Sequence, residues 1–338
     1  MTVLITGGAG YIGSVLTRLL LERGYDVIIL DRLFFGKDSI KEIEDQVKVI
    51  KDDVRWFNPD ILKGVDAVFD LAALSNDPSG ELDPQKTMEI NCMGRVRVAK
   101  LSKKKGVKKY VLASTCSVYG FQEGILDEAS NVNPLTTYAK ASYMAEKEVL
   151  PLADKNFVVT VLRQATVYGF SYRMRFDLAV NGMVKALFEN GKIRIMRDGT
   201  QWRPFVHVKD TSTAFIKVME SEPELVNGQT FNVGSNGQNI QIFKLAKTIA
   251  EACGQEFKYE WYGDPDRRSY KVSFDKIRKV LGYETKHSIA EGAKEIWQKL
   301  SEGTLNPKDP RTITVKWYKH LIEMHKLIRD VEINNKIL

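Results

Sequence analysis

Short apolar runs alternate with amphipathic segments through the first half of the chain. The runs are rich in Val, Ile and Leu and predict buried strands, and the longer segments carry apolar residues on one helical face. Strands are predicted at Thr2–Thr6, Asp26–Leu30, Val47–Val54, Ala67–Ala73, Lys109–Thr115 and Phe157–Leu162, and helices at Ser14–Arg23, Pro84–Lys105 and Thr137–Asp154. This alternation indicates an α/β fold with a doubly wound parallel sheet and right-handed crossovers.

The pattern loosens after Tyr168, where strands and helices become shorter. Strands are expected at Ile193–Met196, Pro204–Val208 and Thr230–Val233, and helices at Phe176–Asn190, Asp210–Glu220 (capped by its aspartate), Ile240–Cys253, Asp275–Leu281 and Ile289–Leu300. We predict one domain over residues 1–167, to which 204–235 return, and a smaller mixed α/β lobe over 168–203 and 236–338. Ligands of open α/β sheets lie at the carboxyl ends of the strands, so this lobe is expected to cover the site.

The segment from residue 311 onward forms a separate C-terminal segment after Pro307 and Pro310. Apolar residues then recur at helical spacing, at Trp317, Leu321, Met324 and Ile328. We expect an amphipathic helix that packs on its own domain rather than one that binds a partner.

The composition is that of a globular protein with neither a membrane span nor a signal peptide. Of 338 residues, 43% are hydrophobic and 28% charged, and no apolar run approaches the length of a membrane span. The first residues lead directly into a core strand. The three cysteines, Cys92, Cys116 and Cys253, suit neither a zinc site nor a disulfide framework, which favours a reduced, cytoplasmic setting without a metal.

The net charge of +7 does not indicate nucleic acid, because the lysines are scattered. The densest run, Lys103–Lys105 with Lys108 and Lys109, lies where a helix is predicted to end, and cations are favourable there. We interpret it as a solvated face. Part of the positive excess suits a doubly charged pyrophosphate ligand.

A glycine-rich loop directly follows the first predicted strand. Gly7, Gly8, Gly10 and Gly13 precede a predicted helix, and Asp31 ends the next strand, eighteen positions beyond Gly13. Glycines allow a tight turn and a close approach to a pyrophosphate, the helix N-terminus favours its charge, and the carboxylate can accept ribose hydroxyls. This context predicts a Rossmann-type dinucleotide site.

Asp31 favours NAD over NADP, because a 2′-phosphate would meet its negative charge. The neighbouring Arg32 points the other way, since an arginine there can pair with a phosphate.

Further short motifs follow in order along most of the chain. They are Thr6-Gly7-Gly8-Ala9-Gly10-Tyr11-Ile12-Gly13, Asp31, Asp53-Val54, Leu71-Ala72-Ala73, Asn91, Ser114-Thr115, Val118-Tyr119-Gly120, Tyr138, Arg163, Val167-Tyr168-Gly169, Arg203-Pro204-Phe205-Val206-His207-Val208, Asp275-Lys276 and Leu281-Gly282-Tyr283. With this set the chain resembles the extended short-chain dehydrogenase/reductases, specifically the nucleotide-sugar epimerases and dehydratases, from Thr2 to about Tyr283.

The resemblance implies a set of cofactor contacts. Asp53-Val54 is expected at the adenine, the Leu71–Ala73 backbone along the dinucleotide, and Asn91 in support of the nicotinamide side. The implied NAD-binding residues are Gly7, Gly10, Tyr11, Ile12, Gly13, Asp31, Asp53, Val54, Leu71, Ala72, Ala73, Asn91 and Tyr138.

The resemblance also implies two catalytic residues. Thr115 would hydrogen-bond the sugar hydroxyl that is oxidised, and Tyr138 would take the proton of that hydroxyl. A phenol with a pKa of about 10 is a poor base near neutrality unless a cation lowers its pKa.

The sequence departs from the family at that cation. The family pattern is Tyr-x-x-x-Lys, but Ser142 stands four residues after Tyr138. A second such pattern at Tyr143 and Lys147 would require moving the whole helix. Lys140 is the nearest substitute in sequence, yet along a helix it should point away from Tyr138. Another cation, or the positive nicotinamide of NAD⁺, would have to lower the pKa of the phenol.

Other residues bear on substrate and reaction type. By the resemblance, Asn181, Arg203 and Arg267 (with Arg268 beside it) would contact the phosphates or the nucleotide of the substrate; the alternative for each arginine is a surface ion pair. Cys116-Ser117 replaces the acidic pair of the 4,6-dehydratases, which argues against dehydration. A small buried residue is the favoured interpretation of Cys116.

These features predict an NAD-dependent nucleotide-sugar epimerase, similar to the UDP-glucose 4-epimerases, with a UDP-sugar as substrate. A nucleotide-keto-sugar reductase is one alternative, and a dinucleotide-binding protein with weakened catalysis is another. The resemblance also implies a homodimer formed by the helices at Pro84–Lys105 and Thr137–Asp154. The apolar residues available for it are Val96, Val98, Leu101, Met144, Ala145 and Val149.

Overall fold

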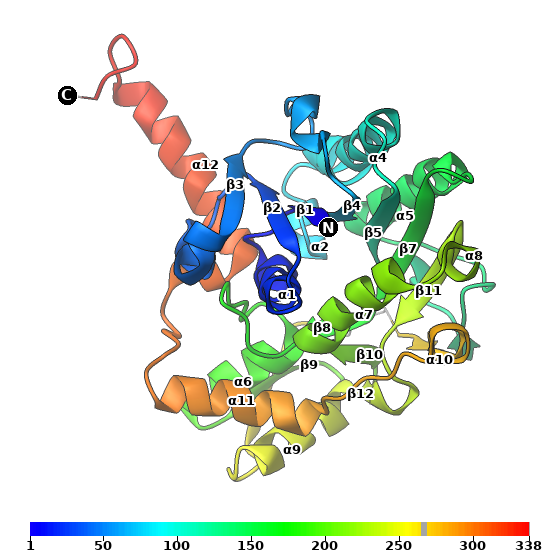
Figure 1. Ribbon diagram of the computed structural model, residues 1–338. Coiled ribbons are helices and arrows are strands. Elements are labelled where there is room, and N and C mark those ends of the chain that lie inside the picture. Colours follow the sequence, from blue (N-terminus) through cyan, green and yellow to red (C-terminus); the bar gives the residue numbers. More distant parts are fainter. Residues whose placement is uncertain (265–268, 338) are drawn as a thin grey trace.

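A computed structural model describes residues 1–264 and 269–337. Its central feature is a seven-stranded sheet in the order β11-β7-β5-β4-β1-β2-β3 (Figure 1). The strands are β1 (Thr2–Thr6), β2 (Asp26–Asp31), β3 (Val47–Lys51), β4 (Ala67–Asp70), β5 (Lys109–Thr115), β7 (Val158–Gln164) and β11 (Gln229–Val233). All their pairings are parallel, which confirms the predicted doubly wound sheet.

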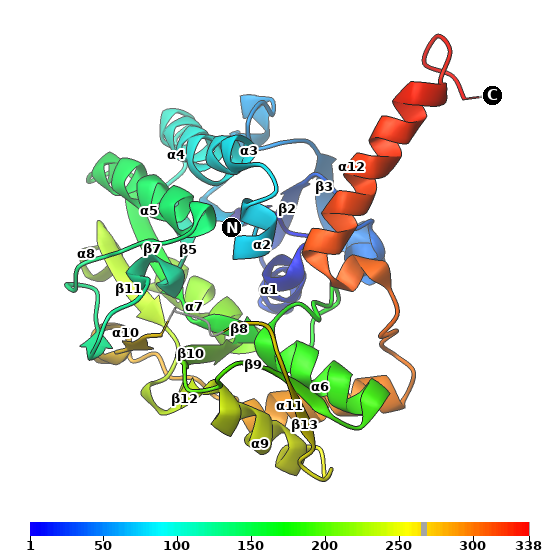
Figure 2. The same ribbon diagram turned by 180° about the vertical axis from the view of Figure 1, so that it is seen from behind.

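Helices cover both faces of this sheet (Figures 1 and 2). One face carries α1 (Tyr11–Glu22) and α7 (Val208–Glu220), and the other carries α3 (Pro84–Met88), α4 (Arg95–Lys104) and α5 (Thr137–Val149). Leu16 and Phe215 are buried on the first face, and Val98 and Ala145 on the second. The strands are therefore buried on both sides, as their continuous apolar sequences require.

A smaller lobe lies beyond the carboxyl ends of the strands. Its helices are α6 (Ala179–Asn190), α9 (Ile242–Ala252) and α11 (Ile289–Ser301), and its strands are β8 (Thr166–Tyr168), β10 (Trp202–His207), β12 (Asn239–Gln241), β9 (Ile193–Met196) and β13 (Tyr259–Tyr262). Short elements complete the fold, namely α2 (Asp77–Gly80), β6 (Ile125–Leu126), α8 (Pro223–Val226), β14 (Lys271–Val272) and α10 (Asp275–Leu281).

The predicted return of residues 204–235 to the large sheet needs one correction. Helix α7 and strand β11 do join the large sheet, but β10 pairs with β8 and β12. Residues 204–207 thus belong to the small sheet. An apolar pattern predicts a strand without saying which sheet the strand joins.

The helix predicted over Pro84–Lys105 is interrupted by a π-turn at Glu89–Gly94. A π-turn adds a residue to one helical turn, so it rotates every later side chain about the helix axis. A Cβ on Gly94 would lie 2.9 Å from Val54 Cγ2, so only glycine allows this close approach. Arg95 is the first residue after the turn.

Several predicted element ends differ from the structure, among them the start of α7 and the end of β3. Helix α7 begins at Val208 and is capped by the ring of His207, which accepts a hydrogen bond from Lys209 N (3.2 Å). Asp210 instead accepts hydrogen bonds from Lys286 N and His287 N. The strand predicted over Val47–Val54 ends at Lys51.

The C-terminal helix α12 (Thr314–Val331) projects away from the body of the molecule (Figures 1 and 2). Its first turns are docked, because Trp317 Nε1 donates to Phe34 O (2.6 Å). Its later apolar residues, such as Met324 (38% exposed) and Ile328 (39%), are not covered. The expectation that the whole helix packs on its own domain is therefore wrong for its second half, because periodicity shows an apolar face but not what covers it.

The surface expected for a homodimer is partly used inside the chain. Val98, Ala145 and Val149 are fully buried in the core between the sheet and these helices, whereas Met144 is 47% exposed. The three buried residues cannot offer surface to a partner. The sequence alone does not distinguish apolar residues on the core face of such helices from apolar residues on their outer face.

Candidate active site

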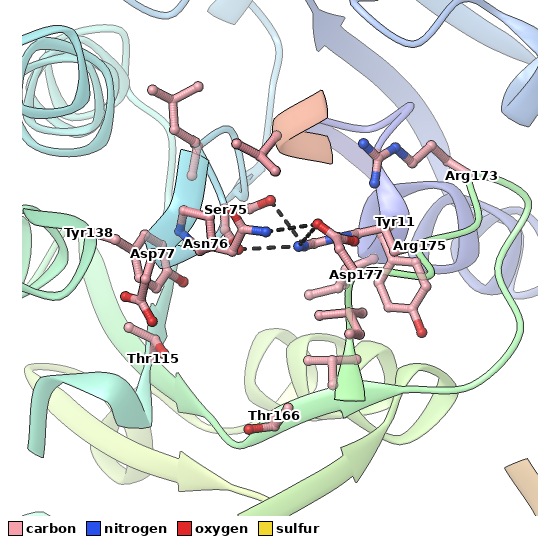
Figure 3. A pocket seen from close by; sticks show the side chains of 18 of the residues that line it. Tyr11, Ser75, Asn76, Asp77, Thr115, Tyr138, Thr166, Arg173, Arg175 and Asp177 are labelled. Carbon is pink, nitrogen blue, oxygen red and sulfur yellow. Dashed lines mark hydrogen bonds and ion pairs between the residues drawn. The ribbon is translucent and has the colours of Figure 1, made fainter. Parts of the chain in front are cut away.

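A cavity of about 880 Å³ lies between the carboxyl ends of the large sheet and the lobe (Figure 3). Its lining comes from the glycine loop, the loops after β2 and β4, the end of β5, the start of α5, the segment around residues 173–186 and α12. We call the part beside Asp31 the β2 end, and the part beside Thr115 and Tyr138 the β5 end.

The glycine loop between β1 and α1 is too tight for side chains at two of its positions. Gly7 has φ +72°, and a Cβ on Gly13 would lie 2.2 Å from Gly7 O. The loop therefore brings its backbone and the N-terminus of α1 directly to the cavity wall, which Tyr11 and Ile12 also line. Such a helix start suits an anionic group, so the loop fits a pyrophosphate.

At the β2 end, Asp31 is held by two backbone N–H groups. Its Oδ2 accepts from Ala9 N (3.0 Å) and its Oδ1 from Leu33 N (2.7 Å). Burial raises the pKa of Asp31, and these two bonds oppose the rise. Each oxygen retains a second lone pair, so the carboxylate can still accept ribose hydroxyls.

Arg32 does not face the cavity with a free charge, because it forms an ion pair with Asp53 (Nη1 to Oδ2, 2.8 Å). Arg55 binds the same carboxylate through Nε and Nη2, each at 2.9 Å. Burial raises the pKa of Asp53, but its bonds to the two arginines hold the pKa below its ordinary value. The carboxylate expected at the adenine is thus already occupied, and a 2′-phosphate would have to compete for Arg32.

Helix α12 contributes to the β2 end, which the sequence did not indicate. Val315 and Tyr318 line the cavity. The ring of Tyr318 lies 5.7 Å from that of Phe34 and 5.4 Å from that of Phe35, centroid to centroid. The C-terminal segment therefore completes an aromatic wall at this end.

Arg173 is a second unexpected residue of the β2 end. Its guanidinium lies 3.5 Å from the centroid of the Phe35 ring, and its Nη2 donates to Thr314 Oγ1 (3.0 Å). Burial lowers the pKa of Arg173 to about 10, and its buried Nε has no hydrogen-bond partner among residues 1–264 and 269–337. A buried cation with an unsatisfied donor at the cavity wall suits an anionic ligand.

Arg175 and Asp177 bridge the middle of the cavity (Figure 3). Their bidentate ion pair has N–O distances of 2.9 and 3.0 Å. Arg175 Nη1 also donates to Ser75 Oγ (3.1 Å), and Asn76 Nδ2 donates to Asp177 Oδ2 (2.7 Å). The loop after β4 is thereby tied to the lobe.

The wall next to this bridge is the backbone after β4. Leu71, Ala72 and Ala73 all line the cavity, as the expected dinucleotide contact requires. Asn91 is fully buried behind them, and its side chain exchanges two hydrogen bonds with the backbone of Leu74 (2.8 and 3.0 Å). Asn91 therefore holds the loop rather than lining the cavity itself.

The β5 end brings together the two residues expected to be catalytic. Tyr138 and Thr115 both line the cavity, Thr115 lowers the pKa of Tyr138, and Thr115 Oγ1 accepts from Ser117 N (3.1 Å). Burial raises the pKa of Tyr138, whereas Arg95, Thr115 and Arg175 lower it and Asp77 raises it. Figure 3 places Tyr138, Thr115 and Asp77 together, across the pocket from Arg173.

None of the candidate substitutes for the missing lysine in α5 reaches this pair. Ser142 is buried, and its Oγ donates to Tyr138 O in its own helix (2.9 Å). Lys140 is exposed, and Lys147 Nζ lies 5.9 Å from the centroid of the Tyr143 ring. None of these four residues lines the cavity.

Arg95 lines the cavity at the β5 end and is only 3% exposed. Its Nε donates to Ala72 O (3.2 Å) and its Nη1 to Ala113 O (2.9 Å). Nothing in the sequence singles out Arg95, because an arginine at the start of a lysine-rich helix is usually exposed to solvent.

The expected substrate residues have different positions. Arg203 lines the cavity, with its guanidinium 5.3 Å from the centroid of the Tyr270 ring. Asn181 is fully buried and does not line the cavity, because its amide bonds Gly169 N (3.0 Å) and the Tyr11 hydroxyl (3.1 Å). Contact between Asn181 and a substrate would require breaking these bonds. Arg267 and Arg268 lie outside the described residues.

Among the residues that the structure describes, no helix is both long and apolar enough to cross a bilayer. No group of His, Cys, Asp and Glu side chains within residues 1–264 and 269–337 is arranged to hold a metal ion.

Comparisons with known proteins agree with this geometry. The model of the NAD dependent epimerase/dehydratase family matches residues 3–234. A UDP-glucose 4-epimerase of Lactobacillus helveticus is 30% identical, over 85% of this chain and 93% of its own. A UDP-glucuronate 4-epimerase of Thermodesulfobacterium geofontis is 28% identical, over 96% and 98%. The solved structure of MoeE5 in complex with UDP-glucuronic acid and NAD has a TM-score of 0.78 at 27% identity, over 89% of this chain and all of that one.

Proposed function

Because the chain belongs to the NAD-dependent epimerase/dehydratase family, we propose that it is an NAD-dependent epimerase that inverts C4 of a UDP-sugar. One observation carries the proposal: the Thr115–Tyr138 pair faces the same cavity as the glycine loop and Asp31. A nucleotide site and a proton-accepting site are thus joined in one space. The names of the relatives support UDP-glucose and UDP-glucuronic acid as the first substrates to test.

The residues of the cavity fit a bound dinucleotide. The glycine loop and the N-terminus of α1 suit its pyrophosphate, Asp31 suits a ribose, and the backbone of Leu71–Ala73 forms the wall beside it. The unsatisfied Nε of Arg173 adds a donor near the β2 end. When bound, NAD supplies a hydride acceptor and, after it is reduced, a hydride donor.

Tyr138 accepts the proton of the C4 hydroxyl in this mechanism and returns it at the end of the cycle. Thr115, which lines the same cavity as Tyr138, orients the hydroxyl for that transfer. Elimination of water is not favoured, since the side chain of Cys116 is 1% exposed and its Sγ bonds Arg163 O (3.2 Å). Cys116 therefore has no access to a substrate.

Recognition of the diphosphate falls to the lobe side of the cavity. Arg203 lines the cavity, and a guanidinium matches phosphate oxygens. Arg267 is proposed for the same role from the sequence alone. Asn181 is better assigned to holding the loop at Gly169 than to substrate.

The enzyme is further proposed to be a cytoplasmic homodimer. Its composition, with three buried free cysteines, suits a reducing compartment. For the dimer, Met93 (64% exposed) and Met144 (47%) offer apolar surface on the two helices expected to pair. A monomeric mass at micromolar concentration would contradict the dimer.

The experiment that tests the proposed function is an incubation with UDP-glucose, and separately with UDP-glucuronic acid, without added reductant. Nuclear magnetic resonance should show the C4 epimer accumulating to an equilibrium mixture. Stoichiometric consumption of NADH or NADPH with a keto-sugar substrate, and no epimer, would instead indicate a reductase.

A further inference from the structure

The β5 end requires a positive charge that helix α5 does not supply. Tyr138 acts as a base only when its phenol loses a proton, and burial raises the pKa of that phenol. Ser142 is uncharged and bonded to its own helix, and Lys140 is exposed. The stabilising charge for a phenolate must therefore come from another element of the chain or from the nicotinamide of bound NAD⁺.

The charged and titratable groups that face Tyr138 come from three other elements. They are Arg95 of α4, Asp77 of α2 and Arg175 of the segment after β8, which line the same cavity as Tyr138 and shift its pKa, as the neutral Thr115 also does. Asp77 disfavours a phenolate. The charge of Arg175 is largely neutralised by its bidentate ion pair with Asp177.

Arg95 differs because its guanidinium has neutral partners. It donates to Ala72 O and Ala113 O, and in the described part of the chain no carboxylate oxygen lies within 4.0 Å of it. A buried cation without an anion costs free energy unless an anion faces it in some functional state. The phenolate of Tyr138 is such an anion.

Other titratable groups near Arg95 do not take this role. Asp70 of β4 is fully buried and accepts hydrogen bonds from Thr6 and Tyr110, and burial raises its pKa, which favours the neutral acid. Burial also raises the pKa of Tyr110 and of Cys92, so both stay protonated near neutrality.

The path of the backbone explains how Arg95 reaches this position. It directly follows the π-turn at Glu89–Gly94, and Gly94 allows the helix to lie against Val54. Its two carbonyl partners belong to the β4 loop and to β5, and Ala113 stands two residues before Thr115. The guanidinium is thereby fixed against the proposed cofactor wall, in the lining of the cavity that Tyr138 also lines.

We propose that Arg95 is the cation that stabilises the Tyr138 phenolate, in place of the lysine that the sequence lacks at position 142. The role of Tyr138 in turnover rests on the proposed function, but the electrostatic coupling between the two side chains does not. Arg95 is thus a positioning residue, acting through Tyr138.

The test compares four variants with the wild type. Arg95→Gln removes the charge but keeps an amide donor for Ala113 O, and Arg95→Lys keeps the charge. Lys140→Gln is the matched control, since it removes one exposed charge from α5. Arg95→Gln combined with Ser142→Lys restores a cation one helical turn from Tyr138.

Two readouts are measured for each variant. The first is the ultraviolet titration of Tyr138, taken as the difference from the same protein carrying Tyr138→Phe, with and without NAD; it needs no substrate. The second is the pH dependence of kcat/KM. Arg95→Gln should move the titration and the rising limb to higher pH by about one unit or more, because a phenol that loses a nearby cation ionises later. Arg95→Lys and the double variant should return both toward the wild-type position.

The outcomes separate this inference from the proposed function. A Tyr138 titration that is unchanged in Arg95→Gln, or that shifts equally in Lys140→Gln, overturns the role of Arg95. If Arg95→Gln does not fold, Arg95→Lys still decides, because a large alkaline shift with the charge retained would contradict the proposal. A shifted titration in a protein that epimerises no UDP-sugar would keep the coupling and reject the proposed reaction.

Discussion

The two ends of the cavity are built in different ways. At the β2 end the key residue, Asp31, is held by nearby backbone groups at Ala9 and Leu33, within one βαβ unit. At the β5 end Tyr138, Thr115 and Arg95 are side chains of three different elements, α5, β5 and α4. The first end is thus held by main-chain hydrogen bonds, whereas the second depends on how the side chains of three elements pack together.

The two ends also treat charge differently. Arg32 and Arg55, beside the β2 end, are paired with the carboxylates of Asp53 and Glu89. At the β5 end the buried Arg95 has only carbonyl partners among the described residues. Cofactor binding and proton transfer are therefore expected to be separable. Changes at the β2 end should alter affinity for the cofactor, and changes at the β5 end should alter turnover.

The largest effect is expected for Tyr138→Phe. It removes the titratable oxygen and leaves the ring packing in place, so kcat should fall by on the order of 10²- to 10⁴-fold. Binding of NAD, measured by calorimetry, should stay nearly unchanged. Substantial turnover in this variant would place the base elsewhere.

The next largest effect is expected for Asp31→Ala at the β2 end. Loss of a charged acceptor for the ribose hydroxyls should raise the Kd for NAD by about ten- to a hundredfold. The kcat at saturating NAD should change little. Arg32→Gln serves as the control, because Arg32 pairs with Asp53; tighter binding of NADP(H) than of NAD(H) by the wild type would contradict the assignment of Asp31.

A smaller effect is expected for Tyr318→Ala in α12. The ring packs on Phe34 and Phe35 and lines the cavity, so its loss should raise the Kd for NAD by about two- to tenfold. Ile328→Ala on the exposed half of the same helix is the matched control. Equal effects of the two variants would show that α12 acts on overall stability and not on the cavity.

Much of the fold followed from local pattern. The strands Thr2–Thr6, Lys109–Thr115 and Ile193–Met196 and the helix Asp275–Leu281 were predicted with the observed bounds. A buried parallel strand is a continuous apolar run, so its ends are marked by the first polar or turn residues. The projecting half of α12 and the sheet to which β10 belongs were not predicted, because both depend on contacts that periodicity does not encode.

Part of the candidate site was also predictable from the sequence. The glycine loop, Asp31, Leu71–Ala73, Thr115, Tyr138 and Arg203 do line one cavity. The buried position of Asn181 and the part played by Arg95 and Tyr318 were not predictable. Their side chains are placed by a π-turn, by a loop from the other lobe and by a distant C-terminal helix, none of which leaves a mark at a fixed spacing.

We propose that the chain epimerises a UDP-sugar with a cofactor that undergoes no net oxidation or reduction. This reaction is tested by turnover of the substrate in D₂O without added cofactor, followed by proton magnetic resonance of the product. We predict that the C4 epimer forms and keeps its original hydrogen at C4, because that hydrogen leaves and returns inside a closed site. Deuterium at C4 of the product, or a strict requirement for added NADH or NADPH, would contradict it.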